Sequence, residues 1–309
     1  MKRFWGGLYL SLAFGLAGSS VVAARVVAAS LGVFTVAASS LLLAWIGLWA
    51  SCSKRLFRDI RCLNRSDWTG LLVQAACGIF FFRLFLLKGL SWTSAGEAGV
   101  LTGATPAFTV ILAAWLLKEA PGTKRILGII STVLGIFFIQ GGLEYGGAIT
   151  RAHWGGNAMV LAAALSESLF NISSKMDSVR KKYAQNSDLD PMVKTTLVIG
   201  IALLLYTVPA CLERPWAGLM ALDLRQWLAL LWYGLVATAL GYVFWYAGIK
   251  RCPASSAAAF SGLMPLTALF LSFLLLGETP GLDQWLGGGL VVTGMLLAGA
   301  SPAGADEEK

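Results

Sequence analysis

Apolar residues in this chain are gathered into ten runs, and polar residues lie in the short segments between them. Most runs are close to the roughly 20 residues that an α-helix needs to cross the hydrocarbon core of a bilayer. We therefore predict an all-α integral membrane protein with ten transmembrane helices. The predicted spans are residues 5–24, 29–50, 68–88, 94–117, 124–142, 154–174, 191–212, 226–248, 254–276 and 283–300.

The two halves of the chain repeat one another. The residues related by a constant shift of 159 positions include Pro106 and Pro265, Glu119 and Glu278, Pro121 and Pro280, Gly128 and Gly287, and Gly135 and Gly294. Since each half holds an odd number of spans, the two copies must cross the membrane in opposite directions. We predict two inverted five-helix repeats, residues 1–150 and 151–304, followed by a disordered tail at residues 305–309. Inverted repeats are typical of secondary transporters, which bind substrate where the halves meet.

Charge supports a membrane location. Only 13% of the residues are charged, against roughly 25% in a soluble domain. The net charge of +8 comes from Lys and Arg, most of which fall on one side of the membrane if both termini are cytoplasmic. This distribution favours a multi-pass membrane protein over one that binds nucleic acid. A compact chain without organellar targeting features favours the bacterial inner membrane.

The most informative ionisable residue is Glu167, which we place near the middle of the sixth span, where a charge is unfavourable and usually functional. Asn157 and Asn171 share its helical face, so the three residues form a polar stripe. Loss of hydration would favour the protonated acid and suit reversible protonation. Glu167 would then exchange protons or bind a substrate ammonium group, although a buried structural hydrogen bond would also explain it.

Arg83 in the third span and Glu97 in the fourth form a second group of candidate site residues. They flank the same predicted outer loop, so we expect them at similar depth, where they could pair as a structural clamp. Alternatively, they could form an outer gate or hold the carboxylate and amine of a substrate. The 159-residue shift relates Arg83 to Tyr242, so the positive charge is present in the first half alone, as expected for a substrate-specific feature.

Three further residues are candidates for the lining of a cavity: Gln74 in the third span, and Tyr242 and Trp245 in the eighth. An aromatic belt at the membrane interface would explain the two aromatic residues as well. The five cysteines show no metal-ligand spacing, and we expect neither a metal nor a cofactor.

Pro106 and Pro265 lie inside the fourth and ninth spans. Proline removes a backbone donor and clashes with the preceding turn, so each predicts a kink, either a hinge or a static bend. Glu119 and Glu278 follow at the ends of the same spans, just before a turn that contains proline. We expect them to cap free amides at a helix start, with direct substrate contact as the alternative.

The repeated Pro, Glu and Gly positions, together with Trp-Gly-Gly at Trp5 and again at Trp154, resemble the drug/metabolite transporter superfamily, and most of all its ten-helix EamA-type branch. The resemblance covers essentially the whole chain. It implies gradient-driven movement of small organic molecules, often export of amino acids, through a cavity lined mainly by helices 1, 3, 4, 6, 8 and 9. Many relatives carry an arginine in the second span, whereas residues 31–50 hold no charge here.

Together these features predict a secondary active transporter of small polar metabolites, most of all amino acids, that exports by alternating access with proton coupling. A carrier of lipophilic cations is the main alternative, and a non-transporting membrane scaffold is a further one. An enzyme is disfavoured because the sequence has no His-Glu-x-x-His, Gly-x-Ser-x-Gly or phosphate-loop motif. The expected partners are a small-molecule substrate, the lipid bilayer and protons, with the chain acting as a monomer or homodimer.

Overall fold

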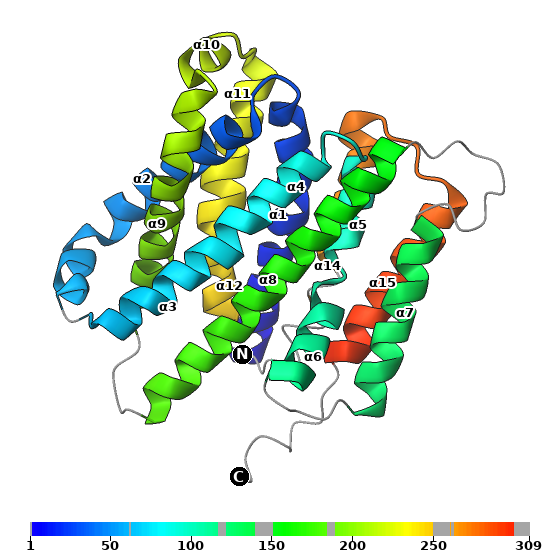
Figure 1. The fold of residues 1–309 in the computed structure, drawn as a ribbon, viewed down its shortest axis with the longest axis horizontal. Helices are drawn as coiled ribbons and strands as arrows, with labels where there is room; N and C mark the ends of the chain where they lie inside the picture. The colour runs from blue at the N-terminus through cyan, green and yellow to red at the C-terminus, as the bar shows by residue number, and fades with distance from the viewer. Residues whose placement is uncertain are drawn as a thin grey trace.

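The computed structural model describes residues 2–61, 63–116, 122–139, 151–183, 189–249, 260 and 263–299, and these residues form helices joined by short connections (Figure 1). The first half contains α1 (Lys2–Ala28), α2 (Val33–Ile60), α3 (Arg65–Ala75), η1 (Ala76–Phe81), α4 (Phe82–Gly89), α5 (Ala95–Thr102), α6 (Thr105–Leu116) and α7 (Thr123–Ile139). The second half contains α8 (Arg151–Tyr183), α9 (Pro191–Leu212), α10 (Pro215–Met220), α11 (Leu224–Leu231), η2 (Trp232–Leu240), α12 (Gly241–Ile249), α14 (Leu263–Leu271), η3 (Ser272–Leu276) and α15 (Leu282–Gly299).

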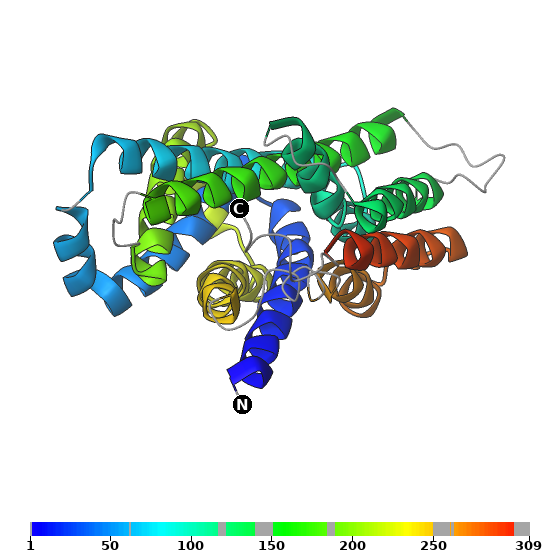
Figure 2. The same cartoon turned by 90° about the horizontal axis from the view of Figure 1, so that it is seen from below.

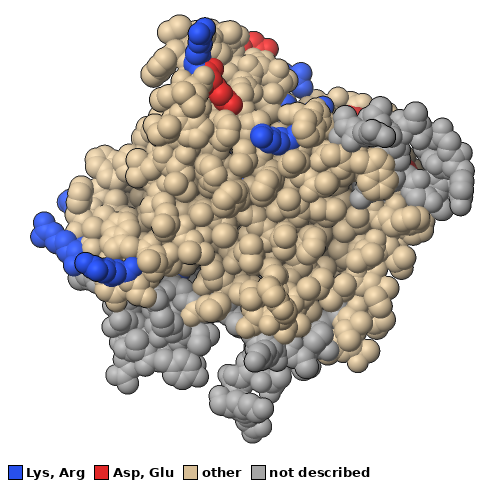
Figure 3. Space-filling view, viewed as in Figure 1, with Lys and Arg blue, Asp and Glu red and all other residues tan. Residues whose placement is uncertain are grey.

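Six of the helical stretches are long and apolar enough to cross a membrane, namely Trp5–Ala28, Val33–Ile60, Arg65–Gly89, Ala95–Leu116, Met192–Leu212 and Leu224–Trp245. Two shorter apolar helices are Ile126–Phe138 and Leu263–Leu276. The middle of the face seen in Figure 3 shows almost no Lys, Arg, Asp or Glu side chains, and those visible on it gather toward the edges. An apolar surface of this width suits lipid, so the chain is a multi-pass membrane protein.

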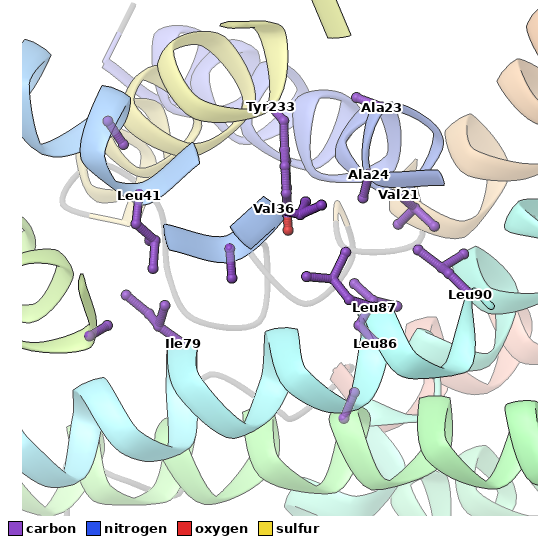
Figure 4. Close-up of a cluster of buried hydrophobic side chains, with 14 of the residues drawn as sticks. Val21, Ala23, Ala24, Val36, Leu41, Ile79, Leu86, Leu87, Leu90 and Tyr233 are labelled. Carbon is purple, nitrogen blue, oxygen red and sulfur yellow. The ribbon is translucent and has the colours of Figure 1, made fainter. Parts of the chain in front are cut away.

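α1 and α8 each contact several other helices. α1 contacts α12 and α14, whereas α8 contacts α4, α5 and α6 (Figure 2). At one side of the molecule α2 packs on α9, and at the other side α7 packs on α15. The buried core in Figure 4 joins α1, α2, η1, α4 and η2 through small and branched side chains such as Ala24, Val36 and Leu87.

Glycines allow α7 and α15 to approach closely. A Cβ atom on Gly135 would lie 2.6 Å from the carbonyl oxygen of Gly287, and a Cβ on Gly294 would lie 2.6 Å from that of Gly128. The hydroxyl of Ser131 also donates to the carbonyl of Leu290 across this interface. Close backbone contact through glycine replaces the hydrophobic effect as the source of helix association in lipid.

Two of the long helices contain π-helical segments, η1 and η2. A π-helical turn shifts backbone hydrogen bonding from i+4 to i+5, which leaves some carbonyls open to side-chain donors. The Tyr206 hydroxyl donates to the carbonyl of Phe80, and the Ser166 hydroxyl donates to that of Cys77 at 2.8 Å. These bonds fasten η1 to α9 and α8.

Two predicted helix ends were wrong. The second span was predicted to end at residue 50, but α2 continues to Ile60 and carries basic residues that we expected in a loop. The sixth span was predicted to end at residue 174, but α8 continues to Tyr183. Hydropathy marks where a chain leaves the hydrocarbon, whereas Lys and Arg are good helix formers and extend a helix into water.

Candidate functional site: three buried polar clusters

Arg83 is a buried cation, 6% exposed, at the start of α4. Its Nη1 donates to the hydroxyl of Ser40 on α2 at 2.7 Å, and its Nη2 donates to the hydroxyl of Thr238 on η2 at 2.6 Å. The guanidinium carbon lies 4.5 Å from the ring centroid of Tyr233, also on η2. Figure 4 shows the Tyr233 side chain reaching from η2 into the space between α2 and α4. Three segments that are distant in sequence therefore meet at one guanidinium.

The partners that the described residues give Arg83 are all neutral. Ion pairs within the described part of the chain join Arg55 to Asp190, Arg58 to Asp59 and His153 to Glu97. Burying a charge without an opposite charge is unfavourable, and the guanidinium fork matches a carboxylate in geometry. The Arg83 cluster is therefore suited to hold an anionic group of a ligand.

Arg83 and Glu97 do not form the structural clamp that was one of the alternatives for them. Arg83 reaches toward α2 and η2, whereas Glu97 contacts side chains from α8 and α15. Residues at similar depth on adjacent helices meet only if both helices turn the right faces toward each other, and the depth of a residue does not fix that rotation.

Glu97 is buried at the start of α5 and is surrounded by donors. His153 Nε2 lies 2.8 Å from its carboxylate, the Thr93 hydroxyl donates to it at 2.8 Å, and Gln284 Nε2 also donates to it. Asn157, one of the three stripe residues, lies 3.5 Å from the same carboxylate. The carboxylate thus ties together the first turns of α5, α8 and α15.

Glu278 caps free amides at a helix start, as expected. Its two carboxylate oxygens accept hydrogen bonds from the backbone amides of Ala95 and Gly96, each at 2.9 Å. These are free amides at the start of α5, in the other half of the chain, and the sequence did not indicate which helix Glu278 would cap. Glu119, its counterpart in the repeat, lies outside the described residues.

Glu213 plays the same part at the start of α2, and sequence reasoning missed it. It accepts hydrogen bonds from the amide of Thr35 at 2.8 Å and that of Phe34 at 3.2 Å. A Cβ on Gly32 would lie 2.2 Å from its carboxylate, so a side chain there would displace the cap. The signal was present, because Glu213 precedes Pro215 with the same spacing that separates Glu278 from Pro280.

Glu167 contacts the helix break at Pro106. The Thr105 hydroxyl lies 2.9 Å from the Glu167 carboxylate, and the hydroxyl of the next residue, Ser168, donates to the Thr105 carbonyl at 2.8 Å. Pro106 is the second residue of α6, which begins three positions after the end of α5 at Thr102. The middle of α8 therefore lies against the interruption in the fourth span.

Gln74 is buried, 1% exposed, and neither its amide nitrogen nor its amide oxygen has a hydrogen-bond partner among the described residues. Such an amide is unfavourable unless a ligand or water satisfies it. Gln74 lies on α3 one helical turn before Gly78, whose Cβ position faces Phe170 on α8.

Tyr242 lines a small cavity between η1, α8, α9 and α12, with room for about one water molecule. The other lining residues are Ile79, Phe170, Thr195, Val198 and Ile199.

The remaining predicted site residues are not among those that line this cavity. Asn171 and Trp245 are half-buried. Pro265 lies in the first turn of α14, and the two residues before Leu263 lie outside the described ranges.

The predicted polar stripe of α8 is divided between two clusters. Asn157 belongs with Glu97, whereas Glu167 belongs with Thr105. Within the described ranges, no three His, Cys, Asp or Glu side chains gather as metal ligands would.

Buried polar and ionisable side chains between membrane-spanning helices are unfavourable and are typical of functional sites in membrane proteins. Comparison with known families identifies the group. The chain belongs to the EamA-like transporter family, whose pattern matches residues 4–141 and 154–300.

Several relatives are named as transporters. The uncharacterized transporter YetK of Bacillus subtilis is 29% identical over 94% of this chain and 86% of its own length. The uncharacterized transporter sll0355 of Synechocystis is 30% identical over 91% of this chain and 86% of its own length. A probable terminal-alkyne amino-acid exporter of Streptantibioticus cattleyicolor is 26% identical over 78% of this chain and 76% of its own length. A crystal structure that is 18% identical and covers 96% of each chain has a TM-score of 0.59, a likeness of fold alone.

Proposed function

We propose that this chain is a secondary active exporter of amino acids or related small zwitterions. The observation that carries the proposal is Arg83, a buried guanidinium whose partners among the described residues are all neutral. A substrate carboxylate would supply the missing negative charge. The relative from Streptantibioticus cattleyicolor, named as a probable terminal-alkyne amino-acid exporter, supports the same substrate class.

Glu167 is the proposed coupling residue. It lies about 15 Å along α8 from the Glu97 cluster, since ten residues separate it from Asn157 at 1.5 Å each. Its hydrogen-bond partner among the described side chains is a hydroxyl and not a cation, so the group is free to take up a proton or a substrate ammonium. Gln74, with its unsatisfied amide, is the proposed third contact for the polar part of the substrate.

The proposed architecture is ten spans in two inverted repeats. The contacts of Gly135 with Gly287 and of Gly294 with Gly128 support it, because the 159-residue shift converts each contact into the other. Ser131 donates to the carbonyl of Leu290, the residue separated from it by 159 positions. Such reciprocal contacts arise when two equivalent helices pack about a two-fold axis.

In this arrangement the Glu97 cluster closes the outer end of the pathway. With both termini on the cytoplasmic side of a bacterial inner membrane, α5, α8 and α15 all begin at the outer surface. Opening the outer end requires the first turns of these helices to separate, which breaks the bonds around Glu97. Alternating access then consists of making and breaking this cluster while substrate occupies the site beside Arg83.

The test is flux in proteoliposomes, with radiolabelled amino acids, amines and lipophilic cations compared under an imposed pH gradient. We expect the pH gradient to drive accumulation of amino acids in the wild type, and we expect Arg83→Gln to abolish this accumulation. Arg225→Gln is the matched control, because Arg225 is exposed and donates to a backbone carbonyl. Transport of lipophilic cations alone, unaffected by Arg83→Gln, would instead establish a drug carrier.

A further inference from the structure

The hydroxyl of Thr105 has two acceptors. Its oxygen lies 2.8 Å from the backbone carbonyl of Thr102 and 2.9 Å from the carboxylate of Glu167. A hydroxyl carries a single proton, so it donates to one of these acceptors at a time. The position of that proton depends on whether Glu167 is itself a donor.

The carbonyl of Thr102 depends on this hydroxyl because of Pro106. In a continuous α-helix the amide of residue 106 would donate to the carbonyl of residue 102, and proline has no amide hydrogen. Thr102 is 2% exposed, so water does not readily replace the missing donor. Buried carbonyls are normally paired, and the Thr105 hydroxyl is the side chain that pairs this one.

We infer that Thr105 is a positioning residue that couples the protonation of Glu167 to the helix break between α5 and α6; this rests on the proposed coupling role of Glu167. When Glu167 is protonated, its O–H donates to Thr105 Oγ1, and Thr105 in turn donates to the Thr102 carbonyl. When Glu167 releases its proton to the transport pathway, Thr105 donates to the carboxylate instead. The Thr102 carbonyl then has no donor among the described residues, and the last turn of α5 is weakened.

The titratable side chains on the helices packed against α8 do not replace the Thr105 hydroxyl as the partner of Glu167. α8 packs against α3, η1, α4, α5 and α6, and the described part of α6 carries no titratable side chain. The titratable groups on the other four elements are Arg65, Asp67, Cys77, Arg83, Lys88 and Glu97. Arg65, Asp67 and Lys88 lie at helix ends, Cys77 contacts α8 through its carbonyl, and Arg83 and Glu97 have the separate partners described above.

The experiment is hydrogen–deuterium exchange of the segment 100–112 in lipid nanodiscs at pH 8, which needs no knowledge of the substrate. Glu167→Gln imitates the protonated acid, because its amide donates to Thr105 Oγ1. We expect this variant to exchange roughly tenfold more slowly in the segment than the wild type, the effect of one restored buried hydrogen bond. In the Thr105→Val background, Glu167→Gln is expected to change nothing.

Two further variants separate coupling from simple packing. Thr105→Ser keeps the hydroxyl and restores the response to Glu167→Gln. Thr109→Val is the matched control, because the Thr109 hydroxyl lies one turn further along α6 and donates to the Thr105 carbonyl at 2.8 Å. It is expected to leave the response to Glu167→Gln intact.

Flux measurements on the same variants distinguish the two proposals. In proteoliposomes, Thr105→Val is expected to remove the pH dependence of the apparent KM for amino acids, and Thr105→Ser to retain it. Equal exchange for the wild type and Glu167→Gln, or an undiminished response in Thr105→Val, would overturn the coupling role of Thr105. A coupled exchange response without amino-acid flux would overturn the proposed function and leave the role of Thr105 in place.

Discussion

The guanidinium of Arg83 lies over the ring of Tyr233, 4.5 Å from the ring centroid, and both side chains are buried. The aromatic face partly offsets the unfavourable burial of the cation, and it holds the guanidinium plane in one orientation. Two hydroxyl acceptors complete the support without neutralising the charge. This arrangement keeps Arg83 in place and leaves its positive charge for a ligand.

Replacement of Tyr233 tests that support. Tyr233→Leu removes the aromatic face while keeping an apolar side chain. We expect the free energy that holds Arg83 in its buried position to become less favourable by about 1–2 kcal/mol. The apparent KM for an amino acid in proteoliposomes should rise roughly tenfold. Tyr233→Phe keeps the ring and should remain close to the wild type. A similar KM for Tyr233→Leu and the wild type would show that the ring does not support Arg83.

Gln74→Leu is expected to stabilise the protein while lowering transport. The amide of Gln74 is buried without partners, so an apolar side chain of similar size should raise the free energy of unfolding by about 1 kcal/mol. Thermal unfolding in detergent measures the stability, and amino-acid flux measures the function. A lower melting temperature for Gln74→Leu would mean that the amide is satisfied in the folded protein by a group other than the substrate.

Removal of the carboxylate caps is expected to destabilise the fold. Glu278→Ala leaves two amides at the buried start of α5 without acceptors, and Glu213→Ala does the same at the start of α2. Each variant should lose about 1–2 kcal/mol, the usual effect of a lost N-terminal cap. Melting temperatures with and without each substitution give the result, and Asp59→Ala, which removes a surface ion pair, serves as the control with a small effect.

Glycine substitutions test the packing of α7 on α15. Gly135→Ala places a Cβ 2.6 Å from a backbone carbonyl, so the helices must separate, and we expect a loss of about 1–3 kcal/mol. Gly289→Ala is the matched control on α15, since nothing lies within 4 Å of its Cβ position. It should be neutral or stabilise by up to about 1 kcal/mol through helix propensity. Equal melting temperatures for the two variants would contradict the close approach of these helices.

The sequence predicted several of these contacts only in part. The Glu-x-Pro pattern indicated that Glu278 caps a helix, but not that the capped helix is α5 from the other half of the chain. Arg83 and Glu97 were recognised as buried charges, yet they belong to different clusters. In each case the residue type indicated the kind of contact, because the chemistry of a side chain is local. The sequence did not identify the partner, because the partner depends on how the helices are packed.

The π-helical segments explain a further failure of sequence reasoning. Residues in the third span were placed by regular helical spacing, but η1 lies between Gln74 and Arg83, and a π-helical turn changes the phase of a helix. Such segments have no clear signal in a single sequence. The open carbonyls of η1, which accept hydrogen bonds from Tyr206 and Ser166, were for that reason not foreseen.

The sequence by itself determined that this chain is helical, that it lies in a membrane, and that it belongs with the EamA-like transporters. These properties follow from runs of apolar residues and from motifs, which are local in the chain. Only the tertiary structure decided that Thr105 stands between Thr102 and Glu167, and that Arg83 meets Ser40 and Thr238. The physical reason is that a hydrogen bond requires atoms to meet within about 3 Å. The rotation and crossing of helices set that distance, and they depend on the packing of the whole molecule.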